Sequence, residues 1–452
     1  MKSIYIKELN HYSKSKLLEI IGNNETIFNK LLDHAIIDKN KDTYQFKYVG
    51  VLIIEESVIN CYPKYITHED NIKTDFKQVL NVIKKYKKLH EDFSYENDEL
   101  ENVSFNILSL MLFFIEDYYE NGIYTNIENI LEINGNGEIN WDKTINDNFA
   151  IIKNNKPYYT ELHTKYKIDD LYDYFRLLHE YIITECSKRL ENSNLLDYFD
   201  LMPIELSDKT LDDFGDLDFI LNKLEKELNI EFNTHKQKLL KSMHAYLSNK
   251  NSFTNENFLT LYGTASYHVI WEEMCSQVFN NKLNKKLNDI INPNEKYSSN
   301  IRLIDVIEKP NWISNYGFNI LADTYIPDLI TFFKGNFIIF DAKYYNLIFE
   351  KDKLRGQPGI ESISKQYFYE LAYKDFINTV SIKGEKNKNV KGVKNAFLFP
   401  TCSDKIENKG YVELELLSSL GLENIQIIML PAKEINQLYL NNKKMDISRL
   451  NL

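Results

Sequence analysis

The feature that most constrains the fold is a pair of strongly apolar runs within residues 324–347, TYIPDLITFFKGNFIIFDAKYYNL. They are separated by Gly335-Asn336, which suits a two-residue hairpin turn with positive φ. Strands that are apolar on both faces usually lie in sheets covered by helices on both sides. This stretch therefore predicts a hairpin buried inside an α/β layer structure.

The open end of this hairpin carries ionisable residues. With Gly335-Asn336 as the loop, counting outward along the two strands places Asp328 opposite Lys343. Side chains alternate along a strand, so Asp341 projects to the same face as Lys343. The sequence thus predicts that the two aspartates and the lysine converge, and a slip of one residue would separate Asp328 from the other two.

Two carboxylates beside a lysine suit metal-assisted hydrolysis of a phosphodiester bond. Mg²⁺ prefers oxygen ligands and keeps several waters, so one or two carboxylates and a scissile phosphate suffice to hold it. The metal neutralises charge on the phosphoryl oxygens and lowers the pKa of a bound water. Lys343 can orient that nucleophile or stabilise the transition state. The alternative is an exposed hairpin end at which Asp and Lys form only a surface ion pair.

A third acidic ligand is expected from the helix predicted at residues 265–283. Trp271 opens an apolar stripe there that recurs at i, i+3, i+4, i+7 and i+8. Glu272 lies on the rim of that stripe and Glu273 points away from it, which favours Glu272; a solvated glutamate is the alternative. The predicted metal ligands are Asp328, Asp341, Ala342 and Glu272, with Mg²⁺ as the cofactor and Mn²⁺ as a substitute.

A second helix, rich in aromatic residues, is predicted at residues 362–376 after the hairpin. Its Gln366 is a candidate catalytic residue that would touch the metal-bound water or the phosphate. Packing of the tyrosines in the core is the alternative explanation of this pattern. Local positive charge comes from Lys351, Lys353 and Arg355 and from the lysine-rich loop at 383–394; these residues either contact DNA or belong to solvated loops.

The length of 452 residues indicates two or three domains. We predict an N-terminal domain with some β-structure over residues 1–130, including a hairpin-like stretch at 44–66 with the turn Glu55-Glu56-Ser57. A mainly α-helical middle region follows over residues 131–250, helical from about 156 onward. Residues 251–452 are predicted to form an α/β sandwich, a mixed sheet flanked by helices. Its strands are expected at 325–333, 337–344, 396–399, 412–417 and 425–430.

Composition excludes several other kinds of protein. The four cysteines form no CxxC pair and no two histidines have the spacing of a helical zinc site, so a metal must be held by carboxylates. No apolar run reaches the roughly 18 residues that a membrane span needs, and the N-terminus lacks a signal sequence, so a cytoplasmic protein is expected. The net charge of -12 opposes binding to DNA phosphates unless a local basic groove or a partner compensates.

Together these motifs resemble the PD-(D/E)xK nucleases, and more narrowly the McrC and LlaJI group of restriction endonuclease subunits. The resemblance is carried by Trp271-Glu272, Pro327-Asp328, Asp341-Ala342-Lys343-Tyr344 and Gln366. Outside the catalytic half it extends to Tyr48-Val49-Gly50-Val51, to Tyr62-Pro63-Lys64-Tyr65, to Gly137 through Trp141 and Thr144, and to Leu178-His179. The match therefore covers most of the chain.

The resemblance implies a PD-(D/E)xK fold and a Mg²⁺-dependent endonuclease subunit that cleaves double-stranded DNA in a restriction system. It also implies a separate McrB-like AAA+ GTPase as partner, and the absence of a GxxxxGK[ST] loop from this sequence is consistent with a motor on another polypeptide. Two alternatives stay open. One is a stand-alone type II enzyme, and the other is a non-catalytic activator that keeps a relic of the nuclease fold.

The N-terminal residues 1–130 are predicted to dock on that GTPase or to bind DNA. Aromatic residues often anchor protein interfaces, and the 44–66 stretch offers Tyr44, Tyr48, Tyr62 and Tyr65. The alternative is that these tyrosines pack inward as the core of a small β-domain.

Overall fold

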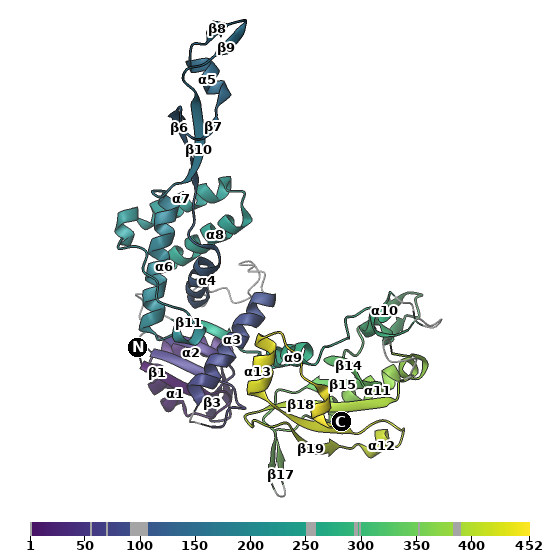
Figure 1. Cartoon of the computed structure of the whole chain (residues 1–452). Helices are drawn as coiled ribbons and strands as arrows, with labels where there is room; N and C mark the ends of the chain where they lie inside the picture. Colours follow the sequence, from purple (N-terminus) through teal and green to yellow (C-terminus); the bar gives the residue numbers. More distant parts are fainter. Residues whose placement is uncertain are drawn as a thin grey trace. The chain divides into compact units, whose positions relative to one another are not determined.

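The structure is a computed structural model that describes residues 2–54, 57–68, 71–90, 107–249, 259–292, 297, 300–350, 353–382 and 390–452. The chain divides into two compact units (Figure 1). The first is built mainly from Leu100–Tyr262, and the second from Ser3–Leu52, Ile59–Glu99 and Gly263–Leu452. Most of the N-terminal region therefore belongs to the same unit as the predicted catalytic half, a grouping that the sequence did not predict.

The second unit contains a five-stranded sheet with the order β14-β15-β18-β20-β19. Its strands are β14 (Leu329–Phe333), β15 (Asn336–Ala342), β18 (Gly392–Thr401), β19 (Glu407–Val412) and β20 (Ile425–Pro431). The central pairs β15/β18 and β18/β20 are parallel, whereas β14 and β19 run antiparallel to their neighbours. The strand predicted at residues 412–417 is wrong, because β19 ends at Val412 and the short helix α12 (Glu415–Ser418) follows.

Helices cover both faces of this sheet. Tyr373 of α11 (Ile360–Thr379) packs in one cluster with Ile339 of β15. On the other side, the ring of Phe279, directly after α9 (Tyr267–Val278), lies 5.3 Å from the ring of Phe340. Neighbouring strand residues face opposite sides, so α11 and α9 cover opposite faces. The α13 helix (Ala432–Leu440) packs against α9 and β20. The mixed α/β class with a helix-covered sheet is as predicted.

The remaining elements that lie wholly or mainly in the second unit are short or N-terminal. They include β1 (Lys2–Lys7), α1 (Lys14–Ile20), α2 (Glu25–Asp33), β2 (Ile37–Asn40), β3 (Thr43–Phe46), β4 (Val49–Ile54), β5 (Ser57–Tyr62) and α3 (Ile72–His90). Later in the chain come α10 (Leu287–Ile290), the hairpin β12 (Asn311–Ile313) with β13 (Asn319–Leu321), and the hairpin β16 (Ile348–Glu350) with β17 (Lys353–Arg355).

The two β-rich runs predicted at residues 44–66 form β4 and β5, and their expected turn at Glu55-Glu56 lies outside the described residues. Every residue of β4 is buried. Tyr48 and Tyr65 are each 5% exposed, so they pack inward and the expectation that they are exposed docking anchors is wrong. Tyr44 and Tyr62 are half-buried. The apolar content of β4 explains this result, because a strand with no polar face must be covered on both sides.

The first unit is largely helical. It contains α4 (Ile107–Asn121), α6 (Tyr174–Asn192), α7 (Leu217–Ile230) and α8 (Thr234–Ser248), in which α4 packs on α6 and α7 packs on α8. His179 is fully buried in α6, and its Nδ1 accepts a hydrogen bond of 3.1 Å from the Tyr124 backbone N–H. Burial lowers the pKa of this histidine to about 4, so His179 is neutral and structural.

Residues 127–169 of this unit form a small β-module instead of continuing the helices. Its elements are β6 (Ile127–Ile133), β7 (Glu138–Ile139), α5 (Trp141–Asp147), β8 (Ile151–Lys153), β9 (Lys156–Tyr158) and β10 (His163–Asp169), with the sheet order β6-β10-β7. The helical structure predicted from residue 156 is thus wrong up to Asp169. Residues 134–137 connect β6 to β7, and a Cβ on Gly137 would lie only 2.3 Å from the Lys165 carbonyl oxygen.

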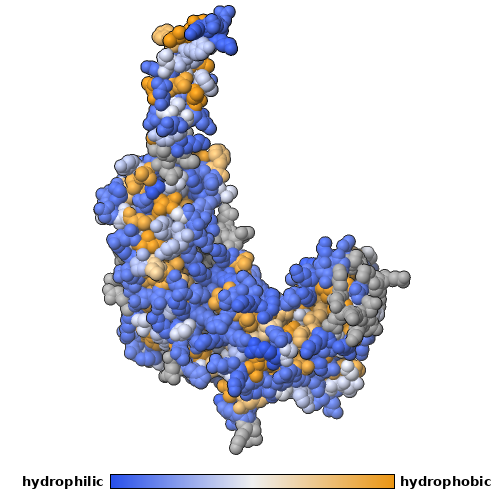
Figure 2. All heavy atoms as spheres, viewed as in Figure 1, coloured by the Kyte–Doolittle hydropathy of each residue, from blue (hydrophilic) through white to orange (hydrophobic). Residues whose placement is uncertain are grey.

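The β-module exposes many large hydrophobic side chains, as the orange patches over it in Figure 2 show. They are Leu131, Ile133, Trp141, Ile145, Phe149, Ile151, Ile152 and Tyr158. Among the described residues, no helix has both the length and the hydropathy required to cross a bilayer.

Candidate active site

The turn between β14 and β15 lies one residue earlier in the chain than predicted. Phe333 pairs with Asn336, so the loop is Lys334-Gly335, with φ of 50° and 85°. Both values are positive, as a two-residue hairpin of this type requires. The correction replaces Lys343 with Asp341 as the register partner of Asp328. Because the partner moves by two positions, the face is unchanged and Asp328 still shares it with Asp341 and Lys343.

The three predicted side chains come together at the open end of the hairpin. Asp328 Oδ2 accepts a hydrogen bond of 3.0 Å from the backbone N–H of Ala342. Lys343 Nζ lies 2.9 Å from Asp341 Oδ1, and the two side chains are 21% and 4% exposed. This ion pair lacks hydrogen-bond alignment, so Asp341 Oδ1 is a buried acceptor without a hydrogen-bond partner among the described residues.

Burial and mutual repulsion make the ionised pair costly. The pKa of Asp341 is raised to about 8, first by burial and then by the charge and hydrogen bond of Asp328, against the opposing effect of Lys343. The pKa of Asp328 is also raised, again mainly by burial. For Lys343, burial opposes the charged form, but the charge of Asp341 outweighs it and the pKa is raised. When both carboxylates are ionised, the single positive charge of Lys343 therefore balances only one of the two negative charges.

Glu272 lies on α9 within electrostatic range of this group. Its pKa is raised by burial first and then by Asp341, while Lys343 lowers it. Glu273 is engaged elsewhere, because its Oε1 accepts a hydrogen bond of 2.8 Å from Gln277. The structure therefore places Glu272, and not Glu273, beside the carboxylate pair.

Gln366 is placed differently from the expectation. It is fully buried, and its Nε2 donates to the backbone oxygen of Ile339 at 3.3 Å and to Asn395 Oδ1 at 2.5 Å. Asn395 in turn donates to the Gln366 backbone oxygen at 3.3 Å. These bonds tie α11 to β15 and β18 in the interior of the sheet, so they give Gln366 a structural task.

Two residues near the site were not identified from the sequence. Asn281 Nδ2 donates to the Asp328 backbone oxygen at 3.0 Å, and its Oδ1 accepts from the Ile330 N–H at 3.1 Å, which fixes the start of β14. Tyr369 of α11 is nearly buried, and its pKa is raised by burial and then by the charges of Asp341 and Asp328. A single Asn after a helix gives no sequence signal, whereas Tyr369 lies three residues after Gln366 on the same helix.

The donor set fits a hard divalent cation. Asp328 and Asp341 supply carboxylate oxygens, one of them lacking a hydrogen-bond partner, and such a pair with waters and a substrate phosphate can hold Mg²⁺. Among the described residues, no three His, Cys, Asp or Glu side chains converge closely enough to hold a metal together. Glu272 thus contributes charge near the pair without completing a three-acid cluster. The only group that Ala342 could offer as a ligand is its backbone carbonyl.

The predicted basic residues lie only partly within the described residues. Lys351 and residues 383–389 of the lysine-rich loop are outside the described residues. Lys353 and Arg355 are exposed on β17, and Arg355 pairs with Glu350 at 3.6 Å. Their contact with DNA stays a prediction.

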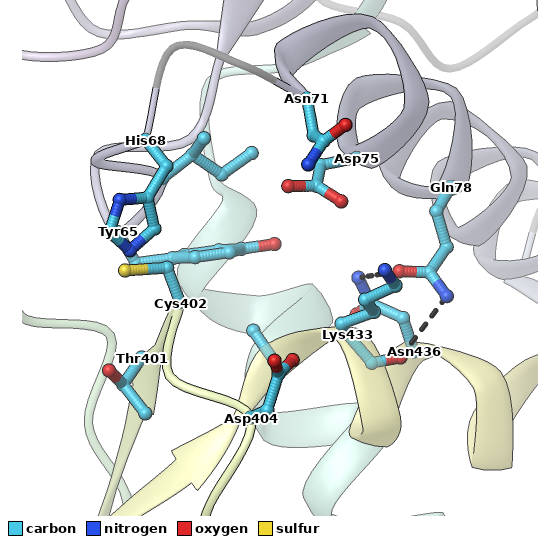
Figure 3. A pocket seen from close by; sticks show the side chains of 12 residues that line it. Tyr65, His68, Asn71, Asp75, Gln78, Thr401, Cys402, Asp404, Lys433 and Asn436 are labelled. Atoms are coloured by element: carbon cyan, nitrogen blue, oxygen red, sulfur yellow. Dashed lines mark hydrogen bonds between the residues drawn. The ribbon is translucent and has the colours of Figure 1, made fainter.

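A separate cavity of about 270 Å³ lies elsewhere in the second unit (Figure 3). It is lined by residues that include Tyr65, His68, Asp75, Cys402, Asp404 and Lys433. Burial raises the pKa of Asp75, Lys433 opposes this, and Asp404 adds to it. Because carboxylates and basic groups are mixed in the lining, neither sign of charge dominates, and none of the predicted catalytic residues lines this cavity.

Comparison with known proteins identifies the class. The family model of the LlaJI restriction endonuclease matches residues 48–433, and the chain therefore belongs to this family. It is also similar to the type II restriction enzyme BsuMI component YdjA of Bacillus subtilis (strain 168). The two are 27% identical over 444 residues, which cover 96% of this chain and 88% of that protein.

Solved structures show a weaker likeness. One is a half-complex from a tetradecameric assembly of Thermococcus gammatolerans McrB AAA+ hexamers with bound McrC; it has 11% identity, a TM-score of 0.38, and coverage of 98% of this chain and 100% of that one. Another is the Thermococcus gammatolerans McrBC complex, with 9% identity, a TM-score of 0.22, and coverage of 54% and 79%. Likeness at this level carries no argument about this chain.

Proposed function

We propose that this chain is a Mg²⁺-dependent DNA endonuclease subunit of a restriction system, with Asp328, Asp341 and Lys343 as its catalytic group. The observation that carries the proposal is the buried carboxylate pair at the end of a hairpin, with a lysine at 2.9 Å and an acceptor oxygen without a hydrogen-bond partner. A purely structural pair of this kind would be costly, because a single lysine opposes two buried carboxylates and one acceptor oxygen makes no aligned hydrogen bond.

Each residue has a defined task in this proposal. Asp328 and Asp341 would hold Mg²⁺, which supplies a polarised phosphate and a water of lowered pKa when bound. Lys343 is held by Asp341 in the position where a cation can stabilise charge that develops on the phosphoryl oxygens. Glu272 adds negative charge on the α9 side, where it can orient a water or a second cation. Hydrogen bonds from the Asn281 side-chain amide and from the Ala342 backbone N–H keep Asp328 in place.

The second part of the proposal concerns partners. The curated relative is described as a component of a restriction enzyme, and this chain has no phosphate-binding loop of the GxxxxGK[ST] type. We propose that a separate McrB-like AAA+ GTPase supplies the motor. The β-module at 127–169 exposes many large apolar residues, as the segment around β12 and β13 also does, which makes it a better candidate for docking than the buried Tyr48 and Tyr65.

Plasmid cleavage by the full chain tests both parts. Nicking or cutting with Mg²⁺ or Mn²⁺, its loss in excess EDTA, and occupancy without turnover in Ca²⁺ are expected. Addition of an McrB-like AAA+ GTPase from the same organism, with GTP, should stimulate cleavage. Full activity in EDTA would contradict the metal proposal. Activity that the GTPase leaves unchanged would favour a stand-alone type II enzyme, whereas a chain without activity under every condition would favour the non-catalytic activator.

The docking surface has its own test. Ile151→Asp with Ile152→Asp should remove co-purification with the GTPase, because these exposed residues lie in the β8/β9 hairpin and not in the core. Trp312→Asp, which changes an equally exposed residue on another hairpin, is the control. Loss of binding in the control alone would place the docking site elsewhere.

A further inference from the structure

The segment Tyr62-Pro63-Lys64-Tyr65 is not explained by the functions assigned so far. It follows β5, some 260 residues before Asp328 in the sequence, yet it packs directly on the segment that carries Lys343. Lys64 Nζ lies 4.1 Å from the centre of the Tyr344 ring and 6.0 Å from the centre of the Tyr345 ring. The Tyr65 ring also meets the Tyr344 ring, edge to face, at 6.2 Å.

Tyr344 is held rigidly under this lysine. Its hydroxyl donates a hydrogen bond of 2.5 Å to Glu8 Oε2, and the Lys64 backbone N–H donates to the same oxygen at 3.1 Å. On the other side, the ring of Tyr267 at the start of α9 lies 5.1 Å from the Tyr344 ring. The N-terminal strand β1, the segment after β5 and helix α9 therefore meet at the residue that follows Lys343.

The ammonium group of Lys64 has an unusual environment. It is half-buried, and among the described residues no carboxylate lies within ion-pair distance of it. Glu8 is the acid that contributes to its electrostatics, but Glu8 Oε2 already accepts two hydrogen bonds, and burial raises the pKa of Glu8. The other titratable neighbour is His268, whose pKa is lowered by burial and by Lys64 itself. A half-buried cation whose neighbouring acid lies beyond ion-pair distance and already accepts two hydrogen bonds is suited to binding an anion from outside.

The place of Lys64 points to the kind of anion. Tyr345 is a shared neighbour of the two lysines, because its phenol also contributes to the electrostatics of Lys343. Lys64 is not among the main causes of the pKa shifts of Asp328 and Asp341, so it is not a member of the carboxylate pair. An anion bound at Lys64 while a scissile phosphate occupies the pair would be a neighbouring phosphate of the same DNA.

We infer that Lys64 binds a backbone phosphate of the DNA next to the scissile one, on a platform made by Tyr344 and Tyr345. This inference rests on the proposed function, since it names a substrate contact of the same site. It makes the N-terminal segment part of the substrate-binding surface and gives the YPKY motif a task.

The chain offers a matched control in Lys85. Its Nζ lies 4.4 Å from the centre of the Tyr439 ring, and burial lowers its pKa as it lowers the pKa of Lys64. Unlike Lys64, Lys85 donates to the Tyr439 backbone oxygen and to Asn442 Oδ1, the latter at 2.7 Å. Both lysines thus lie over a tyrosine ring, but the hydrogen-bonding capacity of Lys85 is used within the protein.

The test measures binding of a labelled DNA duplex to the full chain in Ca²⁺ over a series of salt concentrations. Lys64→Gln should weaken binding roughly tenfold and reduce the slope of log K against log salt by about 0.9, the value for one phosphate contact. Lys64→Arg should keep the slope, and Lys85→Gln should change only the melting temperature. In cleavage assays with Mg²⁺, Lys64→Gln should raise KM more than it lowers kcat.

An unchanged salt slope in Lys64→Gln, or the same change in Lys85→Gln, would overturn the inference. The wild-type protein separates this result from failure of the proposed function. If the wild type cleaves DNA with Mg²⁺ and Asp341→Asn does not, the active site stands whatever Lys64 does. If the wild type neither binds nor cleaves DNA, alone or with the GTPase, both proposals fall.

Discussion

The five-stranded sheet contains two buried polar pairs that differ in how far their hydrogen-bonding groups and charges are compensated. Gln366 and Asn395, in the interior, are neutral and exchange hydrogen bonds that join α11 to two strands. Asp328 and Asp341, at the strand ends, are acidic, repel each other and have only Lys343 as a close counter-charge. Both pairs lie in the same sheet, so burial alone does not distinguish a structural pair from a functional one.

The comparison shows that uncompensated charge indicates a functional site better than burial does. A buried neutral amide pair stabilises a fold when its bonds are made, even though Gln366 Oε1 keeps no partner among the described residues. A buried pair of carboxylates makes the fold less stable unless a cation is supplied from outside. Substitutions in the two pairs should therefore have opposite patterns of effect on stability and activity.

The largest effect is expected at Lys343. Lys343→Ala should lower DNA cleavage by about 10³-fold or more, because a cation positioned at the phosphoryl oxygens is lost. The fold should persist, since the side chain lies at a strand end. Lys365→Ala is the control, because Lys365 forms an exposed ion pair with Glu361 on α11. Cleavage by Lys343→Ala within tenfold of the wild-type rate would show that the lysine serves only as a partner of Asp341.

The acidic pair should also impose a pH dependence on stability when no metal is present. The pKa of Asp341 is about 8 in the folded chain and near 3.9 when unfolded, so the folded state binds more protons between these values. Stability is therefore highest below the lower pKa and falls as the pH rises through about 8, by an amount on the order of a few kcal/mol. Thermal unfolding in EDTA from pH 5 to 9 should show this fall, and Asp341→Asn should flatten it. A wild-type curve that rises over the same range would contradict the burial of an acidic pair.

The amide pair should respond in the opposite way. Gln366→Leu should destabilise the protein by about 1–3 kcal/mol, because it leaves Asn395 and the Ile339 oxygen without their partner. Cleavage per folded molecule should stay within about threefold of wild type, because the catalytic side chains would move only slightly. Denaturant unfolding and cleavage assays on the same sample measure both. Loss of cleavage without loss of stability would instead support a catalytic role for Gln366.

The smallest effect is expected at α9. Glu272→Gln should lower cleavage about tenfold, since Glu272 adds charge beside the pair without completing a metal cluster. Glu273→Gln, whose side chain bonds to Gln277, should change cleavage by less than about twofold. Equal effects of the two substitutions would remove Glu272 from the site.

Much of this site could be predicted from the sequence because it lies on one hairpin. Alternation along β14 and β15 places Asp328, Asp341 and Lys343 on one face, and the prediction survived an error in the turn because that error kept the face. Lys334 misled the assignment of the turn, since a lysine with positive φ is uncommon. The strand predicted at 412–417 failed where apolar residues form a short helix instead.

Long-range contacts could not be predicted in the same way. Nothing in the local sequence shows that Glu8 and Lys64 lie against Tyr344, or that residues 3–52 and 59–99 belong to the unit that holds the site. A deletion of residues 1–130 would therefore remove part of the active-site surroundings, so it is not a clean test of partner docking. Point substitutions in the β-module serve better.

The most direct test of the account is Asp341→Asn, measured for DNA cleavage with Mg²⁺ and for thermal stability in EDTA on the same preparation. The amide keeps the size of the side chain but removes one of two repelling charges and a metal ligand. The account predicts that cleavage is lost while the metal-free melting temperature rises above that of the wild type. Cleavage within tenfold of wild type, or a lower melting temperature at pH 8 to 9, would contradict it.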